Sequence, residues 1–135
     1  MGAHRLLGLI RDVVDFMRFE TDHHNIALRP SPVTLLHHTA RKVRTADEVG
    51  HGGSVMVENH PYRHAWGLGR HAASANYFWY LRDPWGSWTE YFTGIGQITD
   101  AWIGREWDVP PAVWCALKPE DFAANLEPAD TARVP

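Results

Sequence analysis

Residues 69–91 read GRHAASANYFWYLRDPWGSWTEY, and this stretch decides how the rest of the chain is interpreted. Two aromatic-rich runs, Asn76–Leu81 and Trp88–Thr93, have the composition of β-strands. Between them lies Asp83-Pro84-Trp85-Gly86, a combination of residues that is typical of turns. The sequence therefore predicts a β-hairpin over residues 76–93.

The length of the hairpin loop decides which side chains face each other. A two-residue loop would place Tyr80 and Glu90 on opposite faces of the hairpin. In a three-residue loop, Pro84 and Trp85 form a type I turn and Gly86 takes the left-handed position. Proline presets φ at the first corner and glycine accepts a positive φ at the third, so we expect this second loop. It places Tyr80 directly across from Glu90.

This hairpin and the preceding Gly69-Arg70-His71 resemble the signature of the type I extradiol ring-cleaving dioxygenases of the vicinal oxygen chelate (glyoxalase/bleomycin resistance) superfamily. In that family a Gly-x-His leads through an aromatic strand ending in Tyr, then two residues and Asp-Pro-x-Gly, to an iron-binding Glu. The matching residues here are His71, Tyr80, Asp83, Pro84, Gly86 and Glu90. Trp79 departs from the pattern, which has an aliphatic residue or Phe at that position, and we expect this difference to affect substrate fit more than the fold.

The length and composition are those of a single folded domain. The 135 residues are 44% hydrophobic, which is enough to bury a core. Lys and Arg are scattered and the net charge is -3, so we expect neither nucleic acid nor an anionic membrane as a partner. No apolar run reaches the ~18 residues of a membrane span, and the first residues lack the core of a signal peptide, which predicts a cytoplasmic protein. The single cysteine, Cys115, leaves imidazole and carboxylate as the available metal ligands.

The order of the expected elements matches one complete module of the superfamily. A strand over residues 33–44 is followed by the capping box Thr45-Ala46-Asp47-Glu48, which opens a helix to about Glu58. A strand at His64–Leu68 then precedes the hairpin. Residues 33–95 thus have the order β, α, β, β, β. The resemblance implies an α+β fold in which a cupped mixed sheet surrounds a metal site.

The segments on either side of this module are expected to differ from it. Residues 1–29 match the last three strands of a preceding module, with strands expected at Leu6–Val14, Asp15–Thr21 and His24–Arg29. Residues 96–135 are rich in proline, which prevents long regular structure, so we expect an irregular tail that docks Trp107 and Trp114.

Two His-His pairs, His23-His24 and His37-His38, each lie on an expected strand. Successive strand residues point to opposite faces, so only one His of each pair can enter the cup. The resemblance implies that these are His24 and His38. For any single His, a surface position or a hydrogen-bonded core position is the simpler interpretation. Four histidines together with a Glu at the family spacing favour a site.

The resemblance also implies the chemistry. It is that of an Fe(II)-dependent extradiol dioxygenase, which inserts both atoms of O2 into a catechol-type ring and cleaves it next to the diol. The metal ligands would be His38 and Glu90, with Mn(II) as the alternative metal. His24 would transfer protons, while His71 and Tyr80 would hydrogen-bond the substrate. The partners are then a small aromatic diol and O2.

The strand and helix that carry the first His ligand in the family have no counterpart here, and His4 does not fit the spacing. We therefore expect an N-terminally shortened member that binds iron weakly, with a free strand edge that drives formation of a homodimer or larger assembly. Two alternatives stay open. One is a degenerate member that binds an aromatic ligand without turnover, and the other is a metal-dependent isomerase or transferase of the same superfamily.

Overall fold

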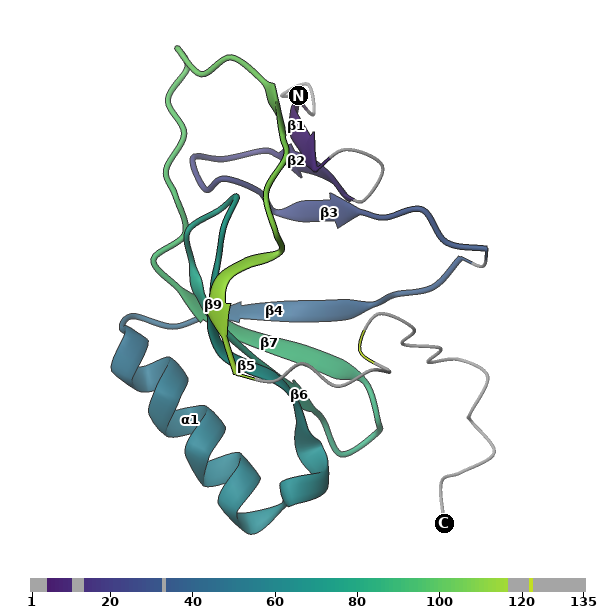
Figure 1. The fold of residues 1–135 in the computed structure, drawn as a ribbon, viewed down its shortest axis with the longest axis vertical. Helices are drawn as coiled ribbons and strands as arrows, with labels where there is room; N and C mark the ends of the chain where they lie inside the picture. Colours follow the sequence, from purple (N-terminus) through teal and green to yellow (C-terminus); the bar gives the residue numbers. More distant parts are fainter. Residues whose placement is uncertain (1–4, 11–13, 33, 117–121, 123–135) are drawn as a thin grey trace.

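The computed structural model describes residues 5–10, 14–32, 34–116 and 122. These residues contain one α-helix and nine strands, and the strands form two neighbouring mixed sheets (Figure 1). The strands are β1 (Arg5–Ile10), β2 (Val14–Arg18), β3 (Ile26–Leu28), β4 (His38–Lys42), β5 (His64–His71), β6 (Tyr77–Arg82), β7 (Trp88–Thr93), β8 (Arg105–Trp107) and β9 (Ala112–Cys115). The helix α1 (Ala46–Asn59) is followed by a short 3-10 turn at Pro61–Arg63. No helix in these ranges is both long and apolar enough to cross a membrane.

The larger sheet contains the module that the sequence predicts. Its strand order is β4-β7-β6-β5-β9, in which β4 runs parallel to β7 and the other neighbours are antiparallel. Along the chain its first four strands and α1 follow the order β, α, β, β, β, which confirms the expectation. The expected α+β fold class is confirmed as well.

The smaller sheet has the order β3-β2-β1-β8. Its three N-terminal strands were all expected, although β3 is shorter than predicted, and His4 lies outside the described residues. The expectation of an irregular tail is wrong for β8 and β9, because β8 pairs in parallel with β1 and β9 pairs with β5. The tail docks Trp107, which is buried, but Trp114 is 46% exposed.

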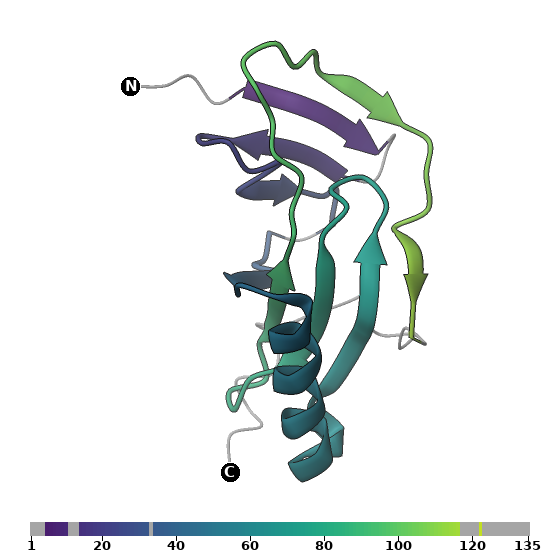
Figure 2. The same cartoon turned by 90° about the vertical axis from the view of Figure 1, so that its left-hand side faces the viewer.

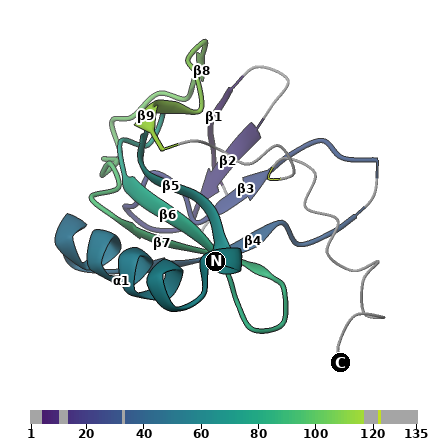
Figure 3. The ribbon, with the colours of Figure 1, turned by 60° about the horizontal axis from the view of Figure 1, so that its bottom comes forward.

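The helix begins where the capping box predicts. The Thr45 hydroxyl accepts a hydrogen bond from the Glu48 backbone N–H at 3.2 Å. The Glu48 carboxylate in turn accepts from the backbone N–H of Arg44 at 2.8 Å. The first bond satisfies one of the backbone N–H groups at the helix start, which have no intrahelical acceptor. The second fixes the Glu48 side chain against the residue that precedes the cap. The helix then covers one face of the larger sheet, lying across β5, β6 and β7 (Figures 2 and 3).

Trp79 lies between the helix and the sheet. A Cβ atom at Gly53 would come within 2.2 Å of the Trp79 indole, so only glycine allows this approach. The indole Nε1 donates to His64 Nδ1 at 3.2 Å. Trp79 therefore points away from the face that carries Tyr80. An effect of Trp79 on substrate fit stays a prediction. The size of Trp79 is accommodated by the helix packing.

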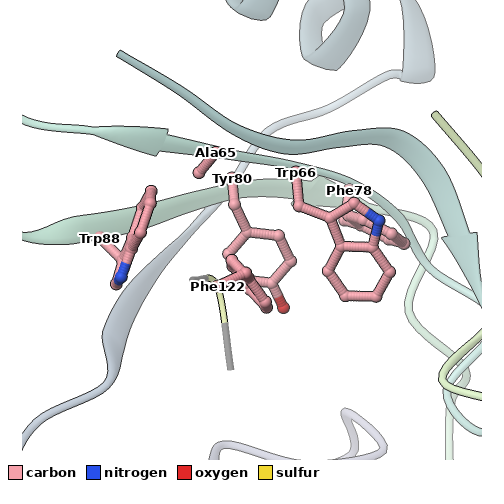
Figure 4. Packing of buried hydrophobic residues seen from close by; sticks show 6 residues of the cluster. All are labelled: Ala65, Trp66, Phe78, Tyr80, Trp88 and Phe122. Atoms are coloured by element: carbon pink, nitrogen blue, oxygen red, sulfur yellow. The ribbon is translucent and has the colours of Figure 1, made fainter. Parts of the chain in front are cut away.

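The aromatic core lies on the opposite face of the larger sheet. Its members come from β5, β6, β7 and one tail residue, and they are Ala65, Trp66, Phe78, Tyr80, Trp88 and Phe122 (Figure 4). The rings of Trp66 and Tyr80 are stacked with their centroids 5.7 Å apart, and the Phe122 ring packs edge-on against Tyr80 with a centroid separation of 4.7 Å. Such aromatic pairs stabilise by about 0.5–1.5 kcal/mol beyond their buried area. The candidate site shares Tyr80 with this core.

Candidate functional site

The hairpin has the three-residue loop that the sequence predicts. The Asp83 N–H donates to the Ser87 carbonyl at 2.9 Å, and Gly86 has φ +92°. The Asp83 carboxylate also accepts from the Trp85 and Ser87 N–H groups, each at 2.9 Å, which holds the turn. As a result Tyr80 on β6 pairs directly with Glu90 on β7. The expected register is confirmed.

Glu90 is the charged centre of the site. It is only 6% exposed, and its Oε1 accepts a hydrogen bond from the Asn76 amide at 3.2 Å. Asn76 is itself held by the Ser74 hydroxyl. Burial alone would raise the pKa of Glu90, but the contacts of the carboxylate with the His38 and His71 side chains outweigh it and lower the pKa to about 2. Glu90 is therefore a carboxylate at neutral pH.

Two imidazoles approach this carboxylate from different strands. His38 Nε2 lies 3.5 Å from Glu90 Oε2, and His71 Nε2 lies 3.6 Å from Glu90 Oε1. These separations are longer than the 2.7–3.2 Å of an N–H···O hydrogen bond. The carboxylate therefore lies between the two imidazole nitrogens without a short hydrogen bond to either.

The ring of His71 is fixed on both sides. Its Nδ1 lies 2.9 Å from the carbonyl oxygen of Pro111, at the start of β9. A carbonyl can only accept, so Nδ1 carries the proton, and in a neutral ring Nε2 is then an acceptor. The Tyr80 hydroxyl lies 3.2 Å from this Nε2 and donates to it. Burial, and then the Glu90 charge, raise the pKa of Tyr80, so its hydroxyl stays protonated and remains a donor.

His24 belongs to the same cluster. Its ring packs on Phe16 at 4.7 Å, and its Nδ1 lies 3.0 Å from His23 Nδ1. Burial is the main cause that lowers its pKa to about 4, with a further contribution from His23. Glu90, His38 and His71 also act on this pKa, which places His24 within electrostatic reach of all three. The imidazole is therefore neutral at pH 7, as a group that accepts protons requires.

The two His-His pairs differ from the expectation in one respect. His23 and His24 lie before β3, and His37 lies just before β4, so the strand alternation that we assumed does not apply to either pair. Instead of pointing to opposite faces, the two rings of each pair are hydrogen-bonded to each other through their Nδ1 atoms. The structure brings four of the predicted site residues into contact, namely His38, His71, Tyr80 and Glu90. His24 contacts Phe16 and His23 and interacts electrostatically with Glu90, His38 and His71.

The donor set suits a first-row divalent metal. A carboxylate and imidazole nitrogens with open positions are the ligands of non-haem Fe(II) sites. His38 and Glu90 fit two positions of such a site. In the described ranges, however, no three His, Cys, Asp or Glu side chains are grouped so as to hold a metal ion.

Several residues of the site were missed by sequence reasoning. Asn76 could have been found, because strand alternation places it on the same face as Tyr80, four residues along. The Pro111 carbonyl and Phe122 come from the tail, and no local pattern indicates that they reach the site. His37 was visible as one member of a pair, but its contact with Phe122 depends on packing between segments far apart in the sequence.

Comparison with solved structures identifies the fold. The Mn(II)-bound glyoxalase from Novosphingobium aromaticivorans is 27% identical, with a TM-score of 0.72 over 80% of this chain and 36% of that one. The 2,2',3-trihydroxybiphenyl 1,2-dioxygenase of Sphingomonas wittichii gives a TM-score of 0.75 at 20% identity, over 86% of this chain and 43% of that one. The chain has the vicinal oxygen chelate fold.

Sequence comparison gives a more specific similarity than the fold does. Metapyrocatechase 2 of Cupriavidus necator is 38% identical over 129 residues, which cover 91% of this chain and 40% of that protein. The chain is thus similar to this metapyrocatechase, and it spans about two fifths of the length of this relative. No family model matches the chain.

Proposed function

We propose that this protein is an Fe(II)-dependent extradiol dioxygenase that inserts both atoms of O2 into a catechol-type substrate and cleaves the ring next to the diol. The observation that carries the proposal is the convergence of His38 Nε2 and His71 Nε2 on the buried Glu90 carboxylate, with the Tyr80 hydroxyl and the neutral His24 beside them. The relationship to metapyrocatechase supports the same chemistry.

In this proposal the side chains have distinct roles. His38 and Glu90 hold the metal, and bound Fe(II) supplies open positions for the two oxygens of a diol and for O2. His24 is neutral at pH 7 and accepts a proton from a diol hydroxyl. When substrate binds, Tyr80 turns its hydrogen bond from His71 Nε2 to a substrate oxygen, since burial keeps its hydroxyl protonated. The aromatic core around Tyr80 excludes water from this side of the site.

The proposal is tested by oxygen uptake with catechol and added ferrous iron. We expect ring opening in which both added oxygen atoms come from isotopically labelled O2. A protein that binds iron stoichiometrically but consumes no O2 with any simple catechol would refute it. The alternative of a degenerate member that binds an aromatic ligand without turnover would then be favoured, because the described residues contain no group of three or more His, Cys, Asp or Glu side chains that could hold a metal ion. The similarity to a glyoxalase supports the other alternative, a metal-dependent isomerase, which would need no O2.

We also propose that the chain assembles into a homodimer or larger species through β3. This strand ends the order of the smaller sheet, and Ile26 and Leu28 on it are 41% and 53% exposed. In the larger sheet the corresponding antiparallel strands end in β7, whose outer edge is covered by the parallel strand β4. An uncovered, apolar strand edge favours pairing with another chain. Sedimentation as a monomer at micromolar concentration would contradict this.

A further inference from the structure

The His37 ring connects the tail to the candidate metal ligand. Its Nε2 lies 3.0 Å from the carbonyl oxygen of Phe122, and its Nδ1 lies 2.8 Å from Nδ1 of His38. The opposite nitrogen of His38, Nε2, is the one that faces Glu90. The Phe122 carbonyl, the His37 ring and the His38 ring are thus joined by two successive hydrogen bonds. The direction of the second bond follows from the direction of the first.

The carbonyl oxygen at Phe122 can only accept, so His37 Nε2 carries a proton. In a neutral His37 ring the other nitrogen, Nδ1, is then an acceptor. His38 Nδ1 must donate to it, which leaves the lone pair of His38 on Nε2. The 3.5 Å between His38 Nε2 and Glu90 Oε2 agrees with this, because it is too long for an N–H donated to the carboxylate.

We propose that His37 is a positioning residue that sets the tautomer of His38 and so presents the His38 Nε2 lone pair to a metal ion. Without an acceptor at His37, the neighbouring Glu90 carboxylate would favour a proton on His38 Nε2, and that proton would block the ligand atom. Histidine ligands commonly donate their second ring N–H in this way, and loss of the partner costs about 10–100-fold in metal affinity. The metal part of the inference rests on the proposed function, whereas the tautomer part does not.

The direct test is the tautomer of neutral His38 in metal-free protein, read from the ¹⁵N shifts of its ring nitrogens. We expect the Nδ1–H form in the wild type and a shift toward the Nε2–H form in His37→Phe. His37→Asn should restore the wild-type tautomer, because its Oδ1 occupies the position of the acceptor Nδ1. His37→Leu serves as a second apolar replacement should the Phe variant fail to fold, and His51→Phe, at an exposed helix position, is the matched control.

The second readout is the apparent Kd for Fe(II) under anaerobic conditions. It should rise about 10–100-fold in the apolar variants and recover in His37→Asn, with no change in His51→Phe. An unchanged Nδ1–H tautomer of His38 in the apolar variants would overturn the inference, and so would an altered tautomer with unaltered iron affinity. If the tautomer shifts as expected but even the wild type binds no metal, the proposed function fails while the positioning of His38 by His37 stands.

Discussion

Acidification should destabilise this protein through His24 in particular. Its pKa is lowered from 6.5 to about 4 in the folded chain, mainly because the ring is buried. Between these two values the unfolded chain binds a proton that the folded chain does not. Stability therefore rises with pH across this window and is lost as the pH falls from 6.5 toward 4.

The size of the effect follows from the two pKa values. At pH 7 the ring is neutral in both states, and its titration costs almost nothing. At pH 5 the unfolded state is almost fully protonated while the folded state is not, which costs about 2 kcal/mol relative to pH 7. A loss of this size is a substantial part of the 5–15 kcal/mol that stabilises a typical domain.

The assay compares metal-free wild type with His24→Phe at pH 7 and pH 5, by urea unfolding followed through tryptophan fluorescence. Other histidines titrate in both proteins, so the informative quantity is the difference between their two pH-dependent losses. We expect the wild type to lose about 2 kcal/mol more than the variant. Equal losses in the two proteins would show that His24 titrates normally in the fold, and would remove the argument that it is neutral because it is buried.

Further predictions concern the metal, the chemistry and the fold. Glu90→Gln and His38→Ala should each stay folded and lose iron, and iron content equal to wild type in either variant would remove the ligand assignment. His24→Phe should keep iron and catechol binding but lose turnover by about 10²–10⁴-fold, measured as kcat for oxygen uptake; an unchanged kcat would exclude the proton-transfer role. Gly53→Ala should destabilise the fold by up to about 2 kcal/mol, because overpacking against Trp79 costs about 1–3 kcal/mol and the gain in helix propensity offsets ~1 kcal/mol of it. Trp79→Leu in the same background should recover part of that loss, and additive urea midpoints would show that the two residues do not compete for space.

The parts of the fold predicted from the sequence depend on local chemistry. Pro84 and Gly86 determine the hairpin loop, and the loop determines that Tyr80 faces Glu90. Thr45 starts the helix, since its hydroxyl binds an N–H only three residues away. In each case the residues that decide the structure are close together in the chain, so the pattern can be recognised without the fold.

The parts that were missed depend on contacts between distant segments. The strands β8 and β9 form because their partners β1 and β5 are already in place, and their proline-rich surroundings indicated irregular structure. The packing of Trp79 against Gly53 was not predicted, because it can be recognised only when the helix and the sheet are placed together. The pairing of His37 with His38 depends on where strand β4 begins, and strand ends are not fixed by alternation.

The link between Pro111 and His71 has a consequence for mutational scanning. The group that orients His71 is a main-chain carbonyl, and every amino acid carries one. Replacing the Pro111 side chain would therefore leave the acceptor present, and a scan of single substitutions would record position 111 as tolerant. The dependence of the His71 orientation on this carbonyl would be detected only by changes that displace the backbone of β9 from β5. The orientation of a histidine can thus depend on a backbone carbonyl, whatever side chain that residue carries.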